Sequence, residues 1–292
     1  MRKLRLRCPA KLNLHLEVLG RRPDGYHELR TVYQTIALCD DLEVEECAAG
    51  FHLAVAGDDS IPAGEGNLVL RAARALSDAF PGGIPGARFR LRQRIPAEAG
   101  LGGGSSDAAA ALAALATLYR IPRGALRGVA ASVGSDVPLF LFGGTLLGTG
   151  RGERIRRLGD LPRLGVVLLV PSWPCPTRQV FAALPPLTPP RGRPKIRPLL
   201  RNLAAGRPAR LRNDLEAAVL GLGHDLGALR AFLEETGALA VGMSGSGSTA
   251  FGLYPDLRTA RARVRRTGVR GTRLLVTEFL ERDVPGTAFA PA

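Results

Sequence analysis

The sequence predicts a two-domain α+β protein, and three observations carry this prediction. A strand-like stretch at 87–95 leads into a glycine-rich loop and then into an Ala/Leu-rich helix. A joint at 159–162 separates two sets of strand and helix patterns. A chain of 292 residues with 46% hydrophobic residues is long enough to bury two cores. We therefore expect one domain over residues 1–159 and a second over residues 160–292.

The elements of the first domain follow from apolar periodicity. Asn67 is the expected N-cap of a helix that carries its apolar residues from Leu68 to Phe80. The helix after the glycine-rich loop is expected over 105–119, beginning at Ser105 or Ser106. A short helix is expected at about 122–132. Strands are expected at about 2–18, 30–46, 51–56, 87–95, 144–149 and 153–158.

The second domain is expected to begin with a strand at Val166–Val170. Residues 184–200 are rich in proline and arginine, which predicts a surface loop. Helices are expected at about 213–221, 225–236 and 256–267, and strands at about 238–242, 249–254 and 272–280.

Composition limits the kind of protein. No apolar run reaches 18 residues and the N-terminus does not resemble a signal peptide, so we expect no membrane segment and a cytoplasmic protein. The four cysteines (Cys8, Cys39, Cys47, Cys175) form no zinc pattern, so we expect buried thiols and no metal held by the protein. The net charge of +14 comes from 37 arginines against 3 lysines. With only 15 aromatic residues, this charge favours a polyanionic small substrate over nucleic acid.

The most informative segment is Pro-Ala-Glu-Ala-Gly-Leu-Gly-Gly-Gly-Ser-Ser-Asp at 96–107. Its glycines permit positive φ, so that consecutive N–H groups can converge on one anion, and the following helix adds its free N–H groups. These features predict a phosphate site. The segment lacks the lysine of a Walker A loop and the last glycine of a dinucleotide loop. The alternative is a glycine-rich turn before a helix capped by Ser105.

Lys11 lies in a stretch, Pro9–Val18, that alternates like a strand. Alternation predicts that Leu12, Leu14, Leu16 and Val18 face inward, with Lys11, Asn13, His15 and Glu17 on the opposite face. Lysine is rare in this chain, which favours a compact ammonium beside a phosphoryl group. The alternative is an ordinary solvated face of a half-buried strand.

Asp136 lies in Val-Gly-Ser-Asp-Val-Pro at 133–138, a pattern that is also typical of a helix N-cap followed by proline. A carboxylate near a lysine stays ionised and can take the proton of an alcohol during phosphoryl transfer. A second glycine run, at 241–249, is either a flexible hairpin or a further N–H-rich surface, formed by Gly245, Ser246 and Gly247.

The segment at 96–107 resembles the ATP motif of the GHMP kinases, which include galactokinase, homoserine kinase and mevalonate kinase. Within that family the chain is most similar to the kinases of 4-diphosphocytidyl-2-C-methyl-D-erythritol, in order from about residue 8 to 254. The matching stretches are Pro9–Leu16, Pro23–Leu29, Gly134–Pro138, Gly150–Glu153, Asn213–Glu216 and Met243–Ser248.

This resemblance implies a two-domain GHMP kinase fold, with an N-terminal domain like ribosomal protein S5 domain 2 and a ferredoxin-like C-terminal domain. It implies that Lys11 and Asp136 are the catalytic pair. It also implies ATP, with Mg²⁺ carried by the nucleotide, on a loop made of Pro96, Ala97, Glu98, Ala99, Gly100, Leu101, Gly102, Gly103, Gly104, Ser105 and Ser106. Glu98 departs from the usual small residue, and we expect its side chain to face solvent.

The resemblance further implies a cytidyl diphosphate substrate, held by Asn13, Tyr26, His27, Thr177 and Phe181, with the cytosine between Tyr26 and Phe181. The implied reaction is ATP-dependent phosphorylation of its 2-hydroxyl, a step of non-mevalonate isoprenoid precursor biosynthesis, by a cytoplasmic monomer or homodimer. Two alternatives remain. One is a GHMP kinase for another small alcohol, and the other is a nucleic-acid-binding protein with an S5-like fold. The turn after Pro23 also explains Tyr26 and His27 without any ligand.

Overall fold

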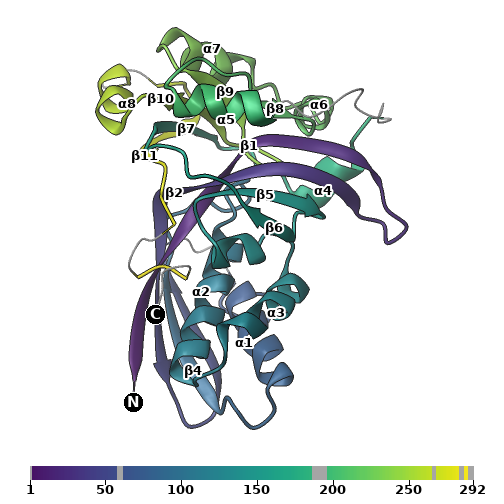
Figure 1. The fold of residues 1–292 in the computed structure, drawn as a ribbon, viewed down its shortest axis with the longest axis vertical. Coiled ribbons are helices and arrows are strands. Elements are labelled where there is room, and N and C mark those ends of the chain that lie inside the picture. Colours follow the sequence, from purple (N-terminus) through teal and green to yellow (C-terminus); the bar gives the residue numbers. More distant parts are fainter. Residues whose placement is uncertain (1, 58–61, 186–195, 265–267, 283–285, 289–292) are drawn as a thin grey trace.

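The computed structural model describes residues 2–57, 62–185, 196–264, 268–282 and 286–288, which form two sheets placed one above the other (Figure 1). The larger sheet follows the order β3-β4-β2-β1-β8, and β5 pairs with both β2 and β6. Its strands are β1 (Lys3–Arg21), β2 (His27–Glu46), β3 (Gly50–Ala56), β4 (Gly86–Arg92), β5 (Thr145–Gly150), β6 (Arg154–Arg157) and β8 (Arg212–Asn213).

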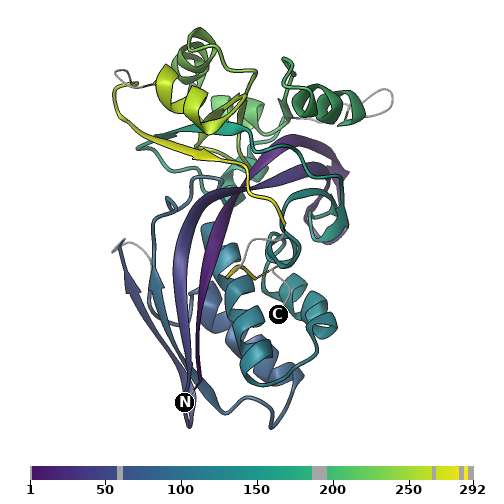
Figure 2. The ribbon, with the colours of Figure 1, turned by 60° about the vertical axis from the view of Figure 1, so that its left-hand side comes forward.

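Helices cover one face of the lower part of this sheet (Figure 2). The central helix α2 (Gly103–Leu118) is apolar on every side because it is enclosed by the sheet and by neighbouring helices. Asn67 caps α1 as expected, since its side chain accepts a hydrogen bond from the Val69 N–H. The other helices here are α1 (Leu68–Ala79), α3 (Leu126–Val133) and the 3₁₀ turns η1 (Arg123–Ala125) and η2 (Pro138–Leu141).

The smaller sheet is antiparallel throughout, in the order β11-β7-β10-β9. Its strands are β7 (Gly165–Pro171), β9 (Ala240–Met243), β10 (Ala250–Tyr254) and β11 (Thr272–Glu278). The helices of this half are α4 (Thr177–Ala182), α5 (Ile196–Ala204), α6 (Glu216–Gly221), α7 (Gly227–Glu235) and α8 (Leu257–Arg263).

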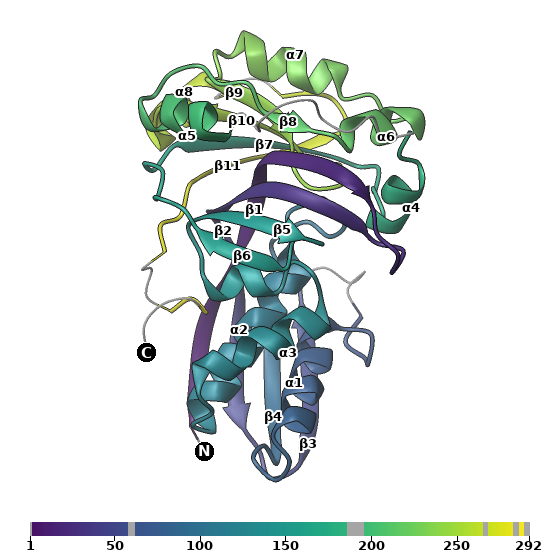
Figure 3. The same ribbon diagram turned by 45° about the vertical axis from the view of Figure 1, so that its right-hand side comes forward.

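Strands β1 and β2 join the two halves. They run the length of the lower half and then bend beneath the smaller sheet (Figure 3). Leu12 and Leu14 of β1 share one buried cluster with Val166, Leu168 and Phe251 of the smaller sheet. This apolar contact fixes the upper part of β1, which carries Lys11, against the second half of the chain.

The predicted alternation along β1 is wrong beyond Asn13. A β-bulge lies between Asn13 and His15, and the extra residue reverses the faces that follow it. Leu16 therefore lines the same cavity as Lys11 and Asn13. Glu17 instead pairs with arginines, at 3.0 Å from Arg30 and 2.7 Å from Arg212. Neither face is solvated, because Lys11 and Asn13 are each only 3% exposed and Leu12 and Leu14 are fully buried.

Two other predicted elements need correction. Helix α2 begins at Gly103 after a left-handed Gly102, not at Ser105 or Ser106, and no side chain caps it. The expected loop at 184–200 is wrong at its end, because α5 begins at Ile196 and buries Leu199 and Leu203, four residues apart. Proline and arginine dominate the local composition and conceal this pattern. Residues 186–195 of that loop lie outside the described residues.

The two sheets do not separate cleanly at residue 160. Strand β8 pairs with β1 of the larger sheet. Further along, the Leu280 N–H donates to the Thr35 carbonyl, and Phe279 forms a bridge with Ile36. The division into 1–159 and 160–292 therefore stays a prediction.

The four cysteines are free thiols and all are buried. Within the described part of the chain, no helix has both the length and the apolar character needed to cross a membrane. Over the same residues there is no group of three or more His, Cys, Asp or Glu side chains that could hold a metal ion.

Candidate active site

A cavity of about 1380 Å³ lies between the upper part of β1 and the second half of the chain. It is lined by residues from both glycine runs, from the β1–β2 hairpin and from α4. Of the residues predicted for the site, the cavity brings together Lys11, Asn13, Tyr26, His27, Gly100, Ser105, Asp136, Thr177, Phe181, Gly245 and Ser246.

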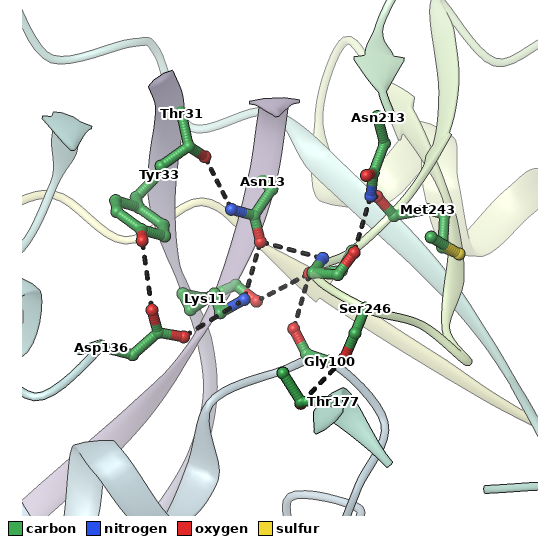
Figure 4. A network of polar contacts seen from close by, with 12 residues as sticks. Lys11, Asn13, Thr31, Tyr33, Gly100, Asp136, Thr177, Asn213, Met243 and Ser246 are labelled. Carbon is green, nitrogen blue, oxygen red and sulfur yellow. Dashed lines mark hydrogen bonds and ion pairs between the residues drawn. The ribbon is translucent and has the colours of Figure 1, made fainter. Parts of the chain in front are cut away.

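Lys11 and Asp136 meet on the wall of this cavity, with Lys11 Nζ 3.6 Å from Asp136 Oδ2 (Figure 4). Lys11 Nζ also donates to Asn13 Oδ1 at 2.7 Å. Burial lowers the pKa of Lys11, and the charge of Asp136 opposes that shift. Asp136 does not cap a helix, because η2 begins two residues later with Val137 as its N-cap. The pair can therefore hold an alcohol between an ammonium and a carboxylate.

Sequence reasoning missed Tyr33, whose hydroxyl donates to Asp136 Oδ1 at 3.1 Å (Figure 4). Tyr33 is buried, and burial raises the pKa of its hydroxyl, so the group remains a donor. A Cβ at Gly148 or Gly152 would overlap the Tyr33 ring or hydroxyl. Tyr33 stands opposite Asn13 across β1 and β2, a pairing that the sequence does not reveal.

Thr31 extends the same network. Asn13 Nδ2 donates to Thr31 Oγ1 at 2.7 Å, and that hydroxyl donates to the His15 carbonyl, also at 2.7 Å. The amide of Asn13 is thus oriented from both ends, with its oxygen toward Lys11. In this structure Asn13 bonds Lys11 directly.

The first glycine run packs tightly against Lys11 and the second run. Gly100 and Gly102 both have φ of +75°. A Cβ at Gly100 would overlap the Ser244 carbonyl oxygen, and one at Gly102 would lie 3.1 Å from Lys11 Cγ. The first N–H groups of α2 have no intrahelical partner, and the buried Ser106 hydroxyl has no hydrogen-bond partner among the residues that the structure describes. This arrangement fits an anion.

The second glycine run connects β9 and β10 and closes over the first. Ser244 Oγ donates to the Gly100 carbonyl at 2.9 Å, and the Gly245 N–H donates to Asn13 Oδ1 at 2.9 Å. The Gly247 N–H bonds the Ser244 carbonyl. The N–H groups of Ser244, Gly245, Gly247 and Thr249 all donate inside the protein, so the run fixes the position of its neighbours as well as lining the cavity.

Aromatic residues gather at the outer end of the cavity. His27 stacks on Phe181 with ring centroids 5.2 Å apart and planes 26° apart. Tyr26, predicted to face Phe181, is 52% exposed. The Arg151 guanidinium lies over its ring, with Arg151 Cζ 4.7 Å from the ring centroid. The ring beside Phe181 is thus that of His27. At the start of α4, Thr177 shares a 3.0 Å hydrogen bond with Ser246.

Comparison with known proteins places this geometry in a family. Models of the GHMP kinases N terminal domain and of the GHMP kinases C terminal region match residues 67–144 and 196–269. The chain is 46% identical over 269 residues to a 4-diphosphocytidyl-2-C-methyl-D-erythritol kinase of Pelotomaculum thermopropionicum, which covers 88% of this chain and 92% of that one. The chain belongs to the GHMP kinase family.

Other comparisons agree with this assignment. A kinase of the same name from Moorella thermoacetica is 41% identical over 285 residues, covering 95% of this chain and 99% of that one. A crystal structure of 4-(cytidine 5'-diphospho)-2C-methyl-D-erythritol kinase superposes with a TM-score of 0.81 at 37% identity, over 94% of this chain and 99% of that one. Homoserine kinase of Cytophaga hutchinsonii, at 17% identity and a TM-score of 0.63, shares the fold. The predicted two-domain GHMP kinase fold is confirmed.

A second, smaller cavity of about 210 Å³ is also lined by the first glycine run in this GHMP kinase. It is lined by Pro96, Ala97 and Glu98 from the loop and by Asp107 from α2. Glu98 is exposed, as expected, with φ of +50°. Residues at the start of α2 thus line both cavities, Ser105 the larger one and Gly103 and Gly104 the smaller one.

Proposed function

We propose that this GHMP kinase transfers the γ-phosphoryl group of ATP to the 2-hydroxyl of 4-diphosphocytidyl-2-C-methyl-D-erythritol. One observation carries the proposal. The Lys11–Asp136 pair lies in a single cavity between the N-terminus of α2 and the His27–Phe181 rings. The substrate is taken from the names of the relatives at 37–46% identity, and it fits a site with a cationic centre and an aromatic end.

Each part of the site has one role in this proposal. The N–H groups at the start of α2 and the bare glycines bind the phosphates of ATP, which supplies the phosphoryl group together with its Mg²⁺. Ser105 and Ser106 follow these glycines directly, so their hydroxyls are the side-chain groups nearest in sequence to the bound phosphates. Asp136 accepts the proton of the acceptor hydroxyl, and Lys11 orients that hydroxyl and stabilises negative charge during transfer.

The aromatic end selects the substrate. A cytosine needs flat partners and polar groups for its edge, and His27, Phe181 and Tyr26 offer both. A GHMP kinase for mevalonate or homoserine has no base to bind, so these rings distinguish the proposed substrate from other small alcohols. The cytoplasm is the proposed compartment because all four cysteines are free thiols. Sedimentation velocity separates a monomer from a homodimer.

A coupled ADP-release assay tests the reaction, with the cytidyl substrate, mevalonate, homoserine and galactose as acceptors. We expect turnover with the cytidyl substrate alone, and ³¹P NMR of the product identifies the phosphorylated hydroxyl. Asp136→Asn should lower kcat by about 10²-fold or more while ATP still binds, and Lys11→Met should do likewise. Preferred turnover of another alcohol would contradict the substrate, and near-normal kcat in either variant would remove that residue from the mechanism.

A further inference from the structure

Asn213 lies on β8, outside the large cavity, and its side chain is buried. Its Nδ2 donates to two main-chain carbonyls of the second glycine run, at 2.9 Å to Met243 and 2.8 Å to Gly245 (Figure 4). Its Oδ1 accepts from the Leu215 N–H at 3.0 Å. The amide therefore joins the strand that follows α5 to the loop between β9 and β10.

Gly245 is held from both sides. Its carbonyl accepts from Asn213, and its N–H donates to Asn13 Oδ1, which also accepts from Lys11 Nζ. Gly245 has φ of +56°, and a Cβ there would lie 2.9 Å from Lys11 Nζ. A displacement of Gly245 would thus reach the catalytic lysine in two ways, through Asn13 and by direct contact.

Strand β8 is itself tied to the strand that carries Lys11. It pairs with β1 in parallel, with Leu16 opposite Asn213. The Asp214 N–H donates to the Leu16 carbonyl at 3.0 Å, and the Val18 N–H donates to Asp214 Oδ2 at 2.9 Å. The loop is therefore positioned relative to β1 at both ends, by Asn13 and by Asn213.

We propose that Asn213 is a positioning residue for phosphoryl transfer. By holding the Gly245 carbonyl, it keeps the Gly245 N–H on Asn13 and so keeps the Lys11 ammonium beside Asp136. This inference rests on the proposed function of the Lys11–Asp136 pair. The competing explanation is that Asn213 only forms the turn before α6, which needs its Oδ1 and not its Nδ2.

Asn213→Ser separates these roles, because a serine hydroxyl can still accept from the Leu215 N–H but cannot replace an amide that bonds two carbonyls. Asn213→Ala removes both roles. Gln34→Ala is the matched control. Gln34 is also buried and donates to two carbonyls, at 3.0 and 3.1 Å, but they belong to Thr35 and Leu280, which do not line the cavity.

Two readouts are needed. The first is kcat, which we expect to fall about tenfold or more in both Asn213 variants and to stay within about twofold in Gln34→Ala. The second needs no activity. The chain has only three lysines, so Lys11 can be titrated by NMR of ¹³C-labelled lysine. Asn13, Asp136 and the Tyr33 ring surround its ammonium. Loosening Asn13 removes an acceptor from the charged form, so the midpoint should move down by about one pH unit.

Wild-type kcat and an unmoved Lys11 midpoint in Asn213→Ser would overturn the proposal. So would equal losses of kcat in Asn213→Ser and Gln34→Ala at equal Tm. Should Asn213→Ala fail to fold, the serine variant decides. If the wild-type chain phosphorylates no acceptor, the proposed function fails, and the Lys11 titration still decides whether Asn213 positions the lysine.

Discussion

Gly102→Ala tests the contact between the first glycine run and Lys11, the proposed catalytic lysine. Gly102 has φ of +75° at the N-cap of α2. Alanine in that left-handed conformation costs about 1–2 kcal/mol. The added Cβ would lie 3.1 Å from Phe140 Cζ and 3.1 Å from Lys11 Cγ. Phe140 is fully buried and cannot withdraw, so the lysine side chain must move by a few tenths of an ångström.

That movement should reduce turnover as well as stability. Lys11 Nζ holds Asn13 at 2.7 Å and Asp136 at 3.6 Å, and both distances change when its methylenes shift. A displacement of about 1 Å at a reacting group costs about 10²-fold in rate, so we expect kcat to fall about tenfold. Overpacking should destabilise the fold by about 1–3 kcal/mol beyond the backbone cost. Each kcal/mol of lost stability should lower Tm by about 2–4 °C.

Gly271→Ala is the matched control. Gly271 also has φ of +75°, but among the described residues no heavy atom beyond its own chain neighbours lies within 4 Å of its would-be Cβ. The Gly271→Ala variant has only the cost of placing alanine in the left-handed conformation, so its Tm should fall while kcat stays within about twofold of wild type. The assay is coupled ADP release with thermal unfolding on the same samples. Equal kcat in the two variants would refute the reasoning, since the loop would then not be packed against a lysine that matters.

Three further perturbations follow from the same structure. Tyr33→Phe removes the donor to Asp136 and should lower kcat about tenfold, because a hydrogen bond to a charged group is worth about 1.5–3 kcal/mol; an equal loss in Tyr254→Phe, a buried tyrosine outside the cavity, would contradict this. Phe181→Ala should raise KM for the cytidyl substrate about tenfold with little change in kcat, and an unchanged KM would place the base elsewhere. Burial raises the pKa of Asp40 to about 6, above its ordinary 3.8, so its contribution to stability is present below pH 4 and is lost as the pH rises through 6. Asp40→Asn should therefore raise the free energy of unfolding by about 2–3 kcal/mol at pH 7.5 and hardly at all at pH 4, as urea unfolding at the two pH values would measure; an equal effect at both would show that the charge is not the cause.

Local chemistry made much of the fold predictable. The cap at Asn67, the strand at 87–95 and the hairpin position of the second glycine run are features of a few adjacent residues, and each lies close to where it was predicted. The predictions failed where a local pattern was interrupted. One extra residue at the β1 bulge reversed the expected faces of His15 and Glu17. Arginine and proline around 196–204 concealed the helical spacing of Leu199 and Leu203.

The candidate site shows the same division. Lys11 and the glycine-rich loop stood out in the sequence, because lysine is rare in this chain and because positive φ and bare amides demand glycine. Asp136 looked like an ordinary helix cap, and the resemblance to the GHMP kinases singled it out. The roles of Tyr33, Thr31 and Asn213 did not stand out. Each depends on a partner far along the chain, and ordinary residue types in ordinary strands carry no mark of that partner.

The amino-acid sequence by itself determined that a strand, a positive-φ glycine loop and an alanine-rich helix would follow one another, since backbone conformation is decided within a few residues. Only the tertiary structure decided which groups surround the Lys11 ammonium. Asn13, Asp136 and Gly245 reach it through strand register, a bulge and the docking of the second half on β1. Those contacts depend on how distant segments pack, which no local pattern specifies.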